Sequence, residues 1–323
     1  MFVFNDKFSI QDEGWCLPET IAQVAVDELS QLGQGRIFHG RSNWLLGAEC
    51  LTIDFYPPVF FMVFYRQVSK DWVTKLAKEL INLANLKNNY GEKLSVAIQN
   101  RMIKPIPEVE FLIGEKNQEI IVNEGPFKFL VRLGKNQNIG YFPDARLVRL
   151  YVKDHAKDKK VLNLFSYTCS FSCAALMGGA REVVNIDLSR NALEWGRENH
   201  RLNELDTKVV KFLKHDIFKS WGALKRNGPF DMVIIDPPTF QKGHFEVEKD
   251  YPKLIARLPA FINKRALIIV SLNSPYLGSD YLQGLFSHFV PQFIYQETIP
   301  SPPELHESSE NKGGAKFLCF RSA

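Results

Sequence analysis

The stretch VLNLFSYTCS at residues 161–170 decides the fold, because it combines a short apolar strand with a polar turn that opens a helix. Downstream, apolar strand patterns and helical patterns alternate. Further strands are predicted at 183–187, 208–213, 232–236, 266–271, 292–297 and 316–321, and helices at 170–177, 190–203, 217–226 and 251–263. This alternation predicts an α/β fold with a mostly parallel sheet and helices on both faces.

The two ends of the chain depart from that alternation. No helical pattern is recognised between the last two strands, which meet at a Ser308–Gly314 turn, so they are predicted to form an antiparallel hairpin at the sheet edge. Residues 56–137 are expected to form a smaller α+β domain, including a hairpin of 110–113 with 118–123. Residues 138–323 form the large domain, and residues 1–55 are assigned no clear role beyond a helical pattern at 18–32.

The composition is that of an ordinary globular protein, with 45% hydrophobic and 24% charged residues in a chain of 323. No apolar run is long enough to cross a bilayer, and no signal peptide is recognised, so a cytoplasmic protein is expected. The five cysteines are odd in number and scattered, which argues against a disulfide framework or a zinc site. The net charge of +4 permits a polyanionic partner without requiring one.

Acidic residues follow three of the predicted parallel strands. Parallel sheets bind ligands at the carboxyl ends of their strands, where Asp187, Asp216 and Asp236 fall. Asp187 lies 187 − 163 = 24 residues after Asn163, the spacing at which nucleotide-binding sheets place an acceptor for ribose hydroxyls. A helix cap is the alternative role for Asp187, although Ser189 can also cap the next helix.

The turn after the first strand narrows the choice of ligand. It contains no G-x-G-x-x-G, and the chain has no phosphate-binding G-x-x-x-x-G-K-[ST] motif. A nucleoside cofactor without phosphates, such as S-adenosylmethionine, does not need those glycines. The hydroxyls of Ser166, Thr168 and Ser170 can bond its amino and carboxylate groups while Tyr167 gives apolar cover. A polar turn that only caps a helix is the alternative.

The segment DPPTF at residues 236–240 is the most informative motif. Pro237 and Pro238 fix the backbone and remove two N–H donors, which leaves a rigid corner that presents carbonyl groups. Asp236 can then accept a hydrogen bond from an amino group that loses a proton as it attacks a methyl group. Phe240 can stack on a planar base. The alternative is an ordinary loop with Asp236 as a cap.

Four segments together resemble a known family: GYFPDAR at 140–146, NLFSYT at 163–168, LEWGREN at 193–199 and DPPTF at 236–240. They are similar to the class I S-adenosylmethionine-dependent methyltransferases of the ribosomal RNA large-subunit K/L and I types. The resemblance implies a Rossmann-like class I methyltransferase sheet with an antiparallel C-terminal hairpin, preceded by a smaller α+β domain. It also implies S-adenosylmethionine as the cofactor.

The resemblance implies two groups of site residues, with Arg146 as a partner for the cofactor's carboxylate. The cofactor-binding residues are Phe142, Asp144, Arg146, Asn163, Phe165, Ser166, Tyr167, Thr168, Ser170, Asp187, Leu188, Ser189, Asp216, Ile217 and Asp236. The catalytic residues are Asp236, Pro237, Pro238, Phe240 and Asn273. No metal is implied.

Two positions depart from the family pattern. Cys169 stands where the family usually has glycine, which is expected to narrow the approach of the cofactor and weaken its binding. Members that methylate cytosine C5 use a cysteine after the fifth strand, whereas this chain has SLNSP at 271–275. Members of the K type, which methylate a guanine nitrogen, have an asparagine-containing segment at this place. Asn273 therefore favours a base nitrogen as the target, with guanine preferred, in a nucleotide displaced from its stack.

The sequence thus predicts an S-adenosylmethionine-dependent methyltransferase that acts on a base nitrogen in ribosomal RNA. A methyltransferase for a small molecule or a protein is the alternative enzyme. A non-catalytic RNA-binding assembly protein with the same fold is the alternative from another class. The sequence indicates no oligomeric state.

Overall fold

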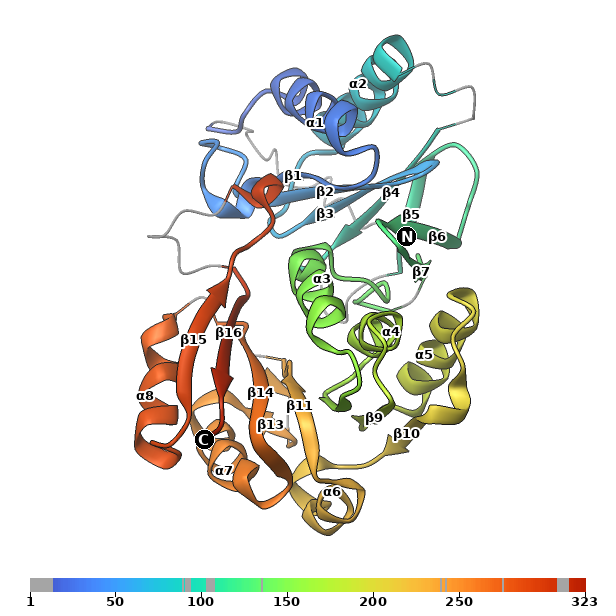
Figure 1. The fold of residues 1–323 in the computed structure, drawn as a ribbon. Helices are drawn as coiled ribbons and strands as arrows, with labels where there is room; N and C mark the ends of the chain where they lie inside the picture. The colour runs from blue at the N-terminus through green and yellow to red at the C-terminus, as the bar shows by residue number, and fades with distance from the viewer. Residues whose placement is uncertain are drawn as a thin grey trace. The chain divides into compact units, whose positions relative to one another are not determined.

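The computed structural model describes residues 14–88, 90, 94–102, 108–134, 136–238, 240–241, 243–274, 276–306 and 314–323. The chain divides into two compact units, each with its own sheet (Figure 1). The described residues of unit 1 fall within 14–123, 130–143 and 303–306. Those of unit 2 fall within 124–129, 144–302 and 314–323.

Unit 1 is built on a five-stranded sheet in the order β1-β2-β3-β4-β5. Its strands are β1 (Gly35–His39), β2 (Leu51–Tyr56), β3 (Val59–Phe64), β4 (Ser95–Asn100) and β5 (Glu110–Ile113), and its helices are α1 (Pro18–Leu32) and α2 (Lys70–Asn88). Only the β3–β4 pair is parallel, since α2 connects those strands. The two helices pack together and bury their apolar faces against the sheet.

Unit 1 differs from the predicted arrangement in two respects. Residues 18–55, upstream of the predicted domain start, supply α1, β1 and nearly all of β2 in the same sheet and core. The predicted hairpin of 110–113 with 118–123 is wrong, because β5 pairs with β4. Instead β6 (Glu119–Glu124) and β7 (Phe127–Arg132) form a separate two-stranded sheet, joined by a tight turn at Gly125, whose φ of 53° suits glycine.

Unit 2 contains the predicted sheet, with seven strands in the order β10-β9-β8-β11-β14-β16-β15. The strands are β8 (Lys160–Leu164), β9 (Glu182–Asp187), β10 (Val210–Lys214), β11 (Phe230–Ile235), β14 (Ile262–Leu272), β15 (Ile294–Ile299) and β16 (Lys316–Arg321). The first five are parallel, and β16 runs antiparallel to both β14 and β15. This confirms the predicted fold class, including the antiparallel C-terminal pair. The predicted Ser308–Gly314 turn lies outside the described residues except for Gly314.

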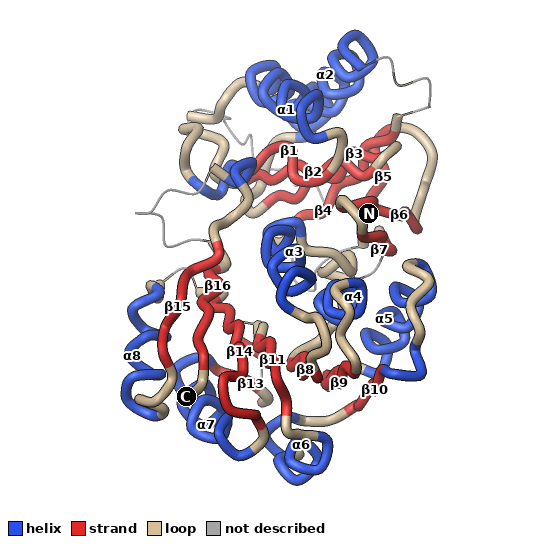
Figure 2. The backbone as a smooth tube through the Cα atoms, viewed as in Figure 1, coloured by secondary structure: helices blue, strands red, loops and turns tan. Residues whose placement is uncertain are grey.

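Helices cover both faces of this sheet (Figure 2). They are α3 (Arg146–His155), α4 (Ser170–Met177), α5 (Arg190–Leu202), α6 (Trp221–Asn227), α7 (Val247–Arg257) and α8 (Ser279–Phe289). The central strands are mostly apolar because both of their faces are largely buried. A hydrophobic cluster of unit 2 packs α6, α7 and α8 against one face, through residues such as Leu224, Tyr251 and Phe286.

The topology brings the ends of the central strands to one edge. From β8 the chain proceeds outward to β9 and β10 on one side, and it later adds β11 and β14 on the other. Ile235 lies beside Leu164, which in turn lies beside Ile186. Asp236, Phe165 and Asp187 are the next residues along these three strands, so they share the carboxyl edge at the point where the strand order reverses.

Candidate active site

The turn after β8 has an unusual backbone. Phe165, Tyr167 and Cys169 all have left-handed φ values, of 57°, 45° and 61°. Such conformations cost free energy in residues other than glycine and concentrate at functional sites. The Ser166 amide donates to the Ile186 carbonyl at 3.0 Å, and the buried Ser166 hydroxyl has no hydrogen-bond partner among the described residues. The turn therefore offers an unused polar group at the sheet's carboxyl edge.

Cys169 occupies the position before α4, in the place of the family's usual glycine. Its side chain is buried, and its thiol lies 3.6 Å from the Tyr167 carbonyl. A Cβ atom on Gly196 of α5 would come within 2.5 Å of the Cys169 sulfur, so the glycine at 196 makes room for the cysteine at 169. Burial raises the pKa of the thiol, which keeps it protonated and unreactive.

Asp187 ties two turns together at the end of β9. One carboxylate oxygen accepts from the Tyr167 amide at 2.8 Å, and the other accepts from the Ser189 amide at 2.8 Å. Burial raises the pKa of Asp187, and the hydrogen bonds from backbone amides oppose that rise. Ser189 caps α5 by accepting from the Ala192 amide at 3.2 Å, so helix capping does not require Asp187.

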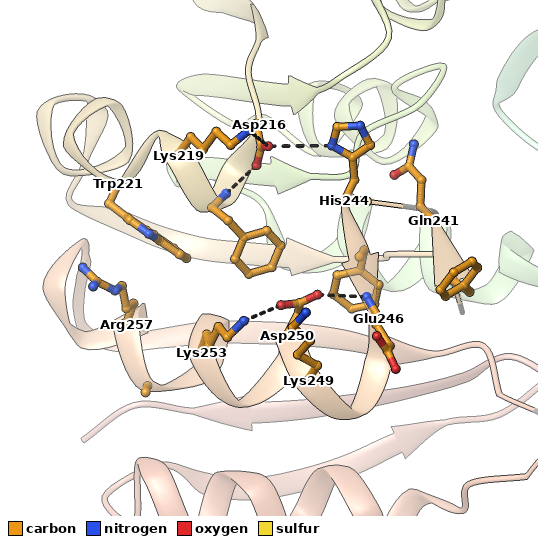
Figure 3. Close-up of a pocket in the computed structure, with 15 residues that line it drawn as sticks. Asp216, Lys219, Trp221, Gln241, His244, Glu246, Lys249, Asp250, Lys253 and Arg257 are labelled. Atoms are coloured by element: carbon orange, nitrogen blue, oxygen red, sulfur yellow. Dashed lines mark hydrogen bonds and ion pairs between the residues drawn. The ribbon is translucent and has the colours of Figure 1, made fainter.

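Asp216, after β10, borders a pocket of about 580 Å³ that Figure 3 shows. The pocket is enclosed by residues 216–221, α7 and the short hairpin of β12 (Phe240–Gln241) and β13 (Phe245–Glu246). Asp216 accepts from the Phe218 amide at 3.0 Å and lies 3.5 Å from Lys219 and 3.7 Å from His244. Two of the predicted site residues, Asp216 and Phe240, thus line one pocket.

Asp236 is the most perturbed carboxyl group at this edge. It is half-buried at the end of β11, and desolvation raises its pKa to about 6 even though donors from the neighbouring strand stabilise its ionised form. Oδ1 accepts from the Ser271 hydroxyl and from Asn273 Nδ2, the latter at 3.1 Å. No group among the described residues donates to Oδ2 of Asp236. One oxygen is therefore fixed, and the other can accept a proton or hydrogen bond.

Ser271 lies near the end of β14, the neighbour of β11 in the sheet, and Asn273 directly follows that strand. Asn273 also donates to the Pro237 carbonyl at 3.0 Å, so one amide group holds both the carboxylate and the proline corner. The hydroxyl of the buried Tyr251 donates to the Ser271 carbonyl and supports the end of β14 from α7. Sequence reasoning identified Asn273 and overlooked Ser271, since a lone serine in a buried strand carries no distinguishing signal.

A buried ion pair also bears on Asp236. Arg149 of α3 binds Glu124 with Nε 2.6 Å from Oε1, and its guanidinium lies 5.2 Å from the centre of the Phe129 ring. The positive charge of Arg149 lowers the pKa of Asp236, whereas the negative charge of Asp144 raises it. This pair could not be predicted from local sequence patterns, because 25 residues separate its two members.

The remaining predicted residues have varied surroundings. Asn163 is buried within β8 and bonds Asn185 at 2.9 Å, so its side chain lies in the core while its Oδ1 atom has no partner among the described residues. Thr168 is buried, and its carbonyl accepts from Asn199 at 2.9 Å. Ile217 is buried, whereas Ser170, Leu188, Asp144 and Arg146 are half-buried. Phe142 belongs to unit 1.

These groups suit a ligand that carries an ammonium group and ribose hydroxyls. The Ser166 hydroxyl can serve a polar ligand, because the weakly bonding Cys169 thiol is the one described side chain that interacts with it. The carboxylates of Asp187 and Asp236 can accept further hydrogen bonds at the same edge. Among the described residues, no group of three or more His, Cys, Asp or Glu side chains is placed to hold a metal ion.

Comparison with known proteins places the chain in a family. The model for S-adenosylmethionine-dependent methyltransferases matches residues 35–321. The chain therefore belongs to that family, its cofactor is S-adenosylmethionine, and the resemblance found in the sequence is confirmed. Within the described residues, no helix is both long and apolar enough to span a bilayer.

Several curated relatives are named for ribosomal RNA. Ribosomal RNA large subunit methyltransferase K/L of Pseudoalteromonas translucida is 33% identical over 57% of this chain and 27% of its own length. Methyltransferase I of Aeromonas salmonicida is 34% identical over 60% of this chain and 49% of its own. A putative large-subunit methyltransferase of Bacillus subtilis, YwbD, is 29% identical over 77% and 63%. The chain thus spans between about a quarter and two thirds of these relatives.

Solved structures agree on the fold. SMU.776, a putative methyltransferase crystallised with SAH, aligns with a TM-score of 0.81 at 24% identity, over 94% of this chain and 80% of that one. Trm5b from Pyrococcus abyssi aligns with a TM-score of 0.61 at 14% identity, over 84% and 75%. At these identities the likeness extends to the fold alone.

Proposed function

We propose that this methyltransferase modifies a base nitrogen in ribosomal RNA, with guanine as the favoured base. The names of the curated relatives support ribosomal RNA as the substrate. Residues 271–275 contain no cysteine, whereas the chemistry at cytosine C5 needs a cysteine nucleophile. Asn273 stands in this segment and bonds Asp236, which is consistent with attack by a nitrogen.

The observation that carries the proposal is the state of Asp236. An exocyclic amino group or ring nitrogen must give up a proton as its bond to the methyl carbon forms. Oδ2 of Asp236 can accept that hydrogen bond or proton, because Ser271 and Asn273 hold only Oδ1. With its pKa raised to about 6, the carboxylate is ionised at neutral pH and still basic enough to take a share of the proton.

Positioning contributes the rest of the rate acceleration. The Asn273 amide joins the Asp236 carboxylate to the Pro237 carbonyl, so the acceptor and the proline corner move as one rigid piece. Phe240 follows this corner with 62% of its surface exposed. A base displaced from its stack can lie on that ring, a contact worth about 1–3 kcal/mol in nucleic-acid complexes.

The cofactor site is proposed at the turns after β8, β9 and β10. S-adenosylmethionine supplies a methyl group activated by its positive sulfur. Ser166 and Arg146 are proposed to hold the amino-acid end, Asp187 the ribose and Asp216 the adenine. The left-handed turn and the Asp187 bridge hold these groups in place before binding, which lowers the entropic cost of complex formation.

Transfer of a labelled methyl group tests this function. Ribosomal RNA from a strain that lacks the protein should accept label from S-adenosylmethionine, and digestion should place the label on a guanine nitrogen. Incorporation into proteins or small molecules but not RNA would overturn the substrate assignment. RNA binding without methyl transfer to any of the three would indicate a non-catalytic assembly protein.

A further inference from the structure

A second set of strand ends, in unit 1, carries an unusual group of side chains. His39 of β1 lies opposite Thr52, which lies opposite Val63 of β3, and Phe64 lies beside Asn100 of β4. The carboxyl ends of β1, β3 and β4 therefore meet at one edge of the sheet (Figure 1). The segments that leave this edge are residues 39–46, 64–66 and 100–102.

Two arginines from different segments gather around one tyrosine at this edge. The guanidinium carbon of Arg41 lies 4.3 Å from the centre of the Tyr65 ring, and that of Arg101 lies 5.8 Å from it. Arg101 donates to the Gln137 carbonyl at 2.9 Å, while its buried Nε has no hydrogen-bond partner among the described residues. The ring thus holds planar, charged donors in place before any ligand arrives.

The three segments that leave this edge carry positive charge, whereas Glu304 and Glu307 flank His306 in the sequence. The three segments contain Arg41, Arg66 and Arg101 and no acidic residue. Among the described residues no carboxylate forms an ion pair with any of the three, and Arg41 and Arg66 are exposed. Two acidic residues that follow Arg41 in the sequence are engaged elsewhere, since Glu49 accepts from the Gly47 amide and Asp54 pairs with Arg36.

An aromatic pair extends the same edge. The rings of Trp44 and His306 lie 4.4 Å apart, and Trp44, 38% exposed, donates to the His39 carbonyl at 3.2 Å. Burial together with the charges of Arg36, Arg41 and His306 lowers the pKa of His39 to about 3. Arg41 and His306 are therefore both close enough to His39 to act on it electrostatically. The edge therefore offers flat ring surfaces beside positive charges.

We propose that this arginine edge, made of Arg41, Trp44, Tyr65, Arg66, Arg101 and His306, binds a single-stranded segment of the RNA substrate. Guanidinium groups bond phosphate oxygens, and exposed rings stack on unpaired bases, so the combination fits a flexible polyanion with planar groups. The inference rests on the proposed function, because it names a contact surface for the same RNA.

The test measures RNA binding without methyl transfer. The probe is a fluorescein-labelled single-stranded oligoribonucleotide of mixed sequence, compared with the matching duplex, and anisotropy gives the dissociation constant at several salt concentrations. The Arg41→Gln/Arg66→Gln double variant should bind the single strand at least about tenfold more weakly. Its slope of log affinity against log salt should shrink by about 1.4, or about 0.7 for each lost phosphate contact.

Two further variants and one control separate stacking and folding effects from charge. Tyr65→Leu removes the aromatic ring on which a base is proposed to stack and should weaken RNA binding about 5- to 150-fold. Arg41→Lys keeps the charge and should retain the salt slope while losing affinity. Lys116→Gln removes an exposed cation of unit 1 outside the edge and should change neither quantity. Melting temperature and calorimetric binding of S-adenosylmethionine verify that each variant is folded.

The outcomes distinguish this inference from the proposed function. Wild-type affinity and slope in the arginine and Tyr65 variants, or an equal loss in Lys116→Gln, would overturn the arginine edge even if the enzyme methylates ribosomal RNA. Preference for an acidic protein over RNA at this edge would also overturn it. If the wild-type protein neither binds nor methylates RNA, the proposed substrate itself is wrong.

Discussion

Asp187 and Asp236 end neighbouring regions of one sheet edge, and they are held in different ways. Backbone amides of Tyr167 and Ser189 hold Asp187, so its partners are present whatever side chains surround it. Side chains of Ser271 and Asn273 hold Asp236, and its pKa rises to about 6. A carboxylate bound by main-chain amides is suited to holding the surrounding turns in place. A carboxylate bound by side chains can have its pKa adjusted for proton transfer by changes in those side chains.

The largest expected effect is that of Asp236→Asn. The amide would present an N–H group where Oδ2 now accepts, so kcat should fall about 10²- to 10⁴-fold, the usual contribution of an acid or base catalyst. Single-turnover rates of methyl transfer measure this loss, and S-adenosylmethionine binding should stay within a few fold. Retention of wild-type kcat would show that Asp236 is only structural.

Stability provides the matched check for the same variant. The folded pKa of Asp236, about 6, exceeds the ordinary value of 3.8, so the folded state loses stability as pH rises from about 4 to about 6. Asp236→Asn should therefore melt higher than wild type at pH 8 and show little difference near pH 4. A lower melting temperature at pH 8 would mean that the loss of activity reflects unfolding.

A second, smaller effect is expected for Asp187→Ala. It removes the acceptor of two turn amides and should weaken S-adenosylmethionine binding about 10- to 150-fold, as measured by calorimetry. Asp206→Ala is the control, because Asp206 also accepts from a backbone amide, that of Lys208 at 2.9 Å, outside the site. If both variants bind the cofactor like wild type, the hydrogen bonds of Asp187 to the two turn amides are not needed for cofactor binding.

Ser271→Ala tests whether a side-chain donor sets the pKa of Asp236, through the pH dependence of activity. Activity should rise with pH to a plateau above about 6, because only ionised Asp236 accepts the proton. Loss of the Ser271 hydroxyl removes a donor to the ionised form, so the pKa of Asp236 rises and the profile moves to higher pH. Ser322 follows β16 and accepts from the Ala266 amide of β14, and Ser322→Ala should leave the profile in place. An unmoved profile in Ser271→Ala would contradict a positioning role.

The smallest effect is expected for Cys169→Gly. Glycine relieves a left-handed φ of 61°, while the loss of the buried thiol removes packing, so the free energy of unfolding should change by no more than about 1 kcal/mol. Denaturant titration measures this change, with Cys173→Ala as the control. A clear gain in cofactor affinity would instead support the sequence-based expectation that Cys169 weakens binding.

Strong local signals decided which elements the sequence could predict. The central strands were predictable because burial on both faces demands apolar runs. Helix α5 was predictable because Ser189 caps it with a hydrogen bond. Helices α3 and α8 were missed, whereas α1 and α4 were predicted although all four begin without a side-chain cap. The absence of a cap therefore does not by itself explain why α3 and α8 were missed.

The site residues that could be predicted were also those with a signal in the local sequence. Asp187 and Asp236 could be proposed because strand ends can be read from the sequence, and parallel pairing then brings them to one edge. The Ser271 contact could not be predicted, because it depends on the register between β11 and β14. The placement of β5 beside β4 likewise depends on pairing that the local turn pattern did not specify.

The short return of residues 303–306 to unit 1 has a consequence for synthesis. These residues follow β15 of unit 2 and precede β16, yet the His306 ring packs at a tilt against the ring of Trp44, more than 250 residues earlier in the sequence. On the ribosome, Trp44 emerges long before its partner does. The final form of that aromatic pair must wait until the more than 250 residues between its two members have been translated, and no single cut can release unit 1 intact.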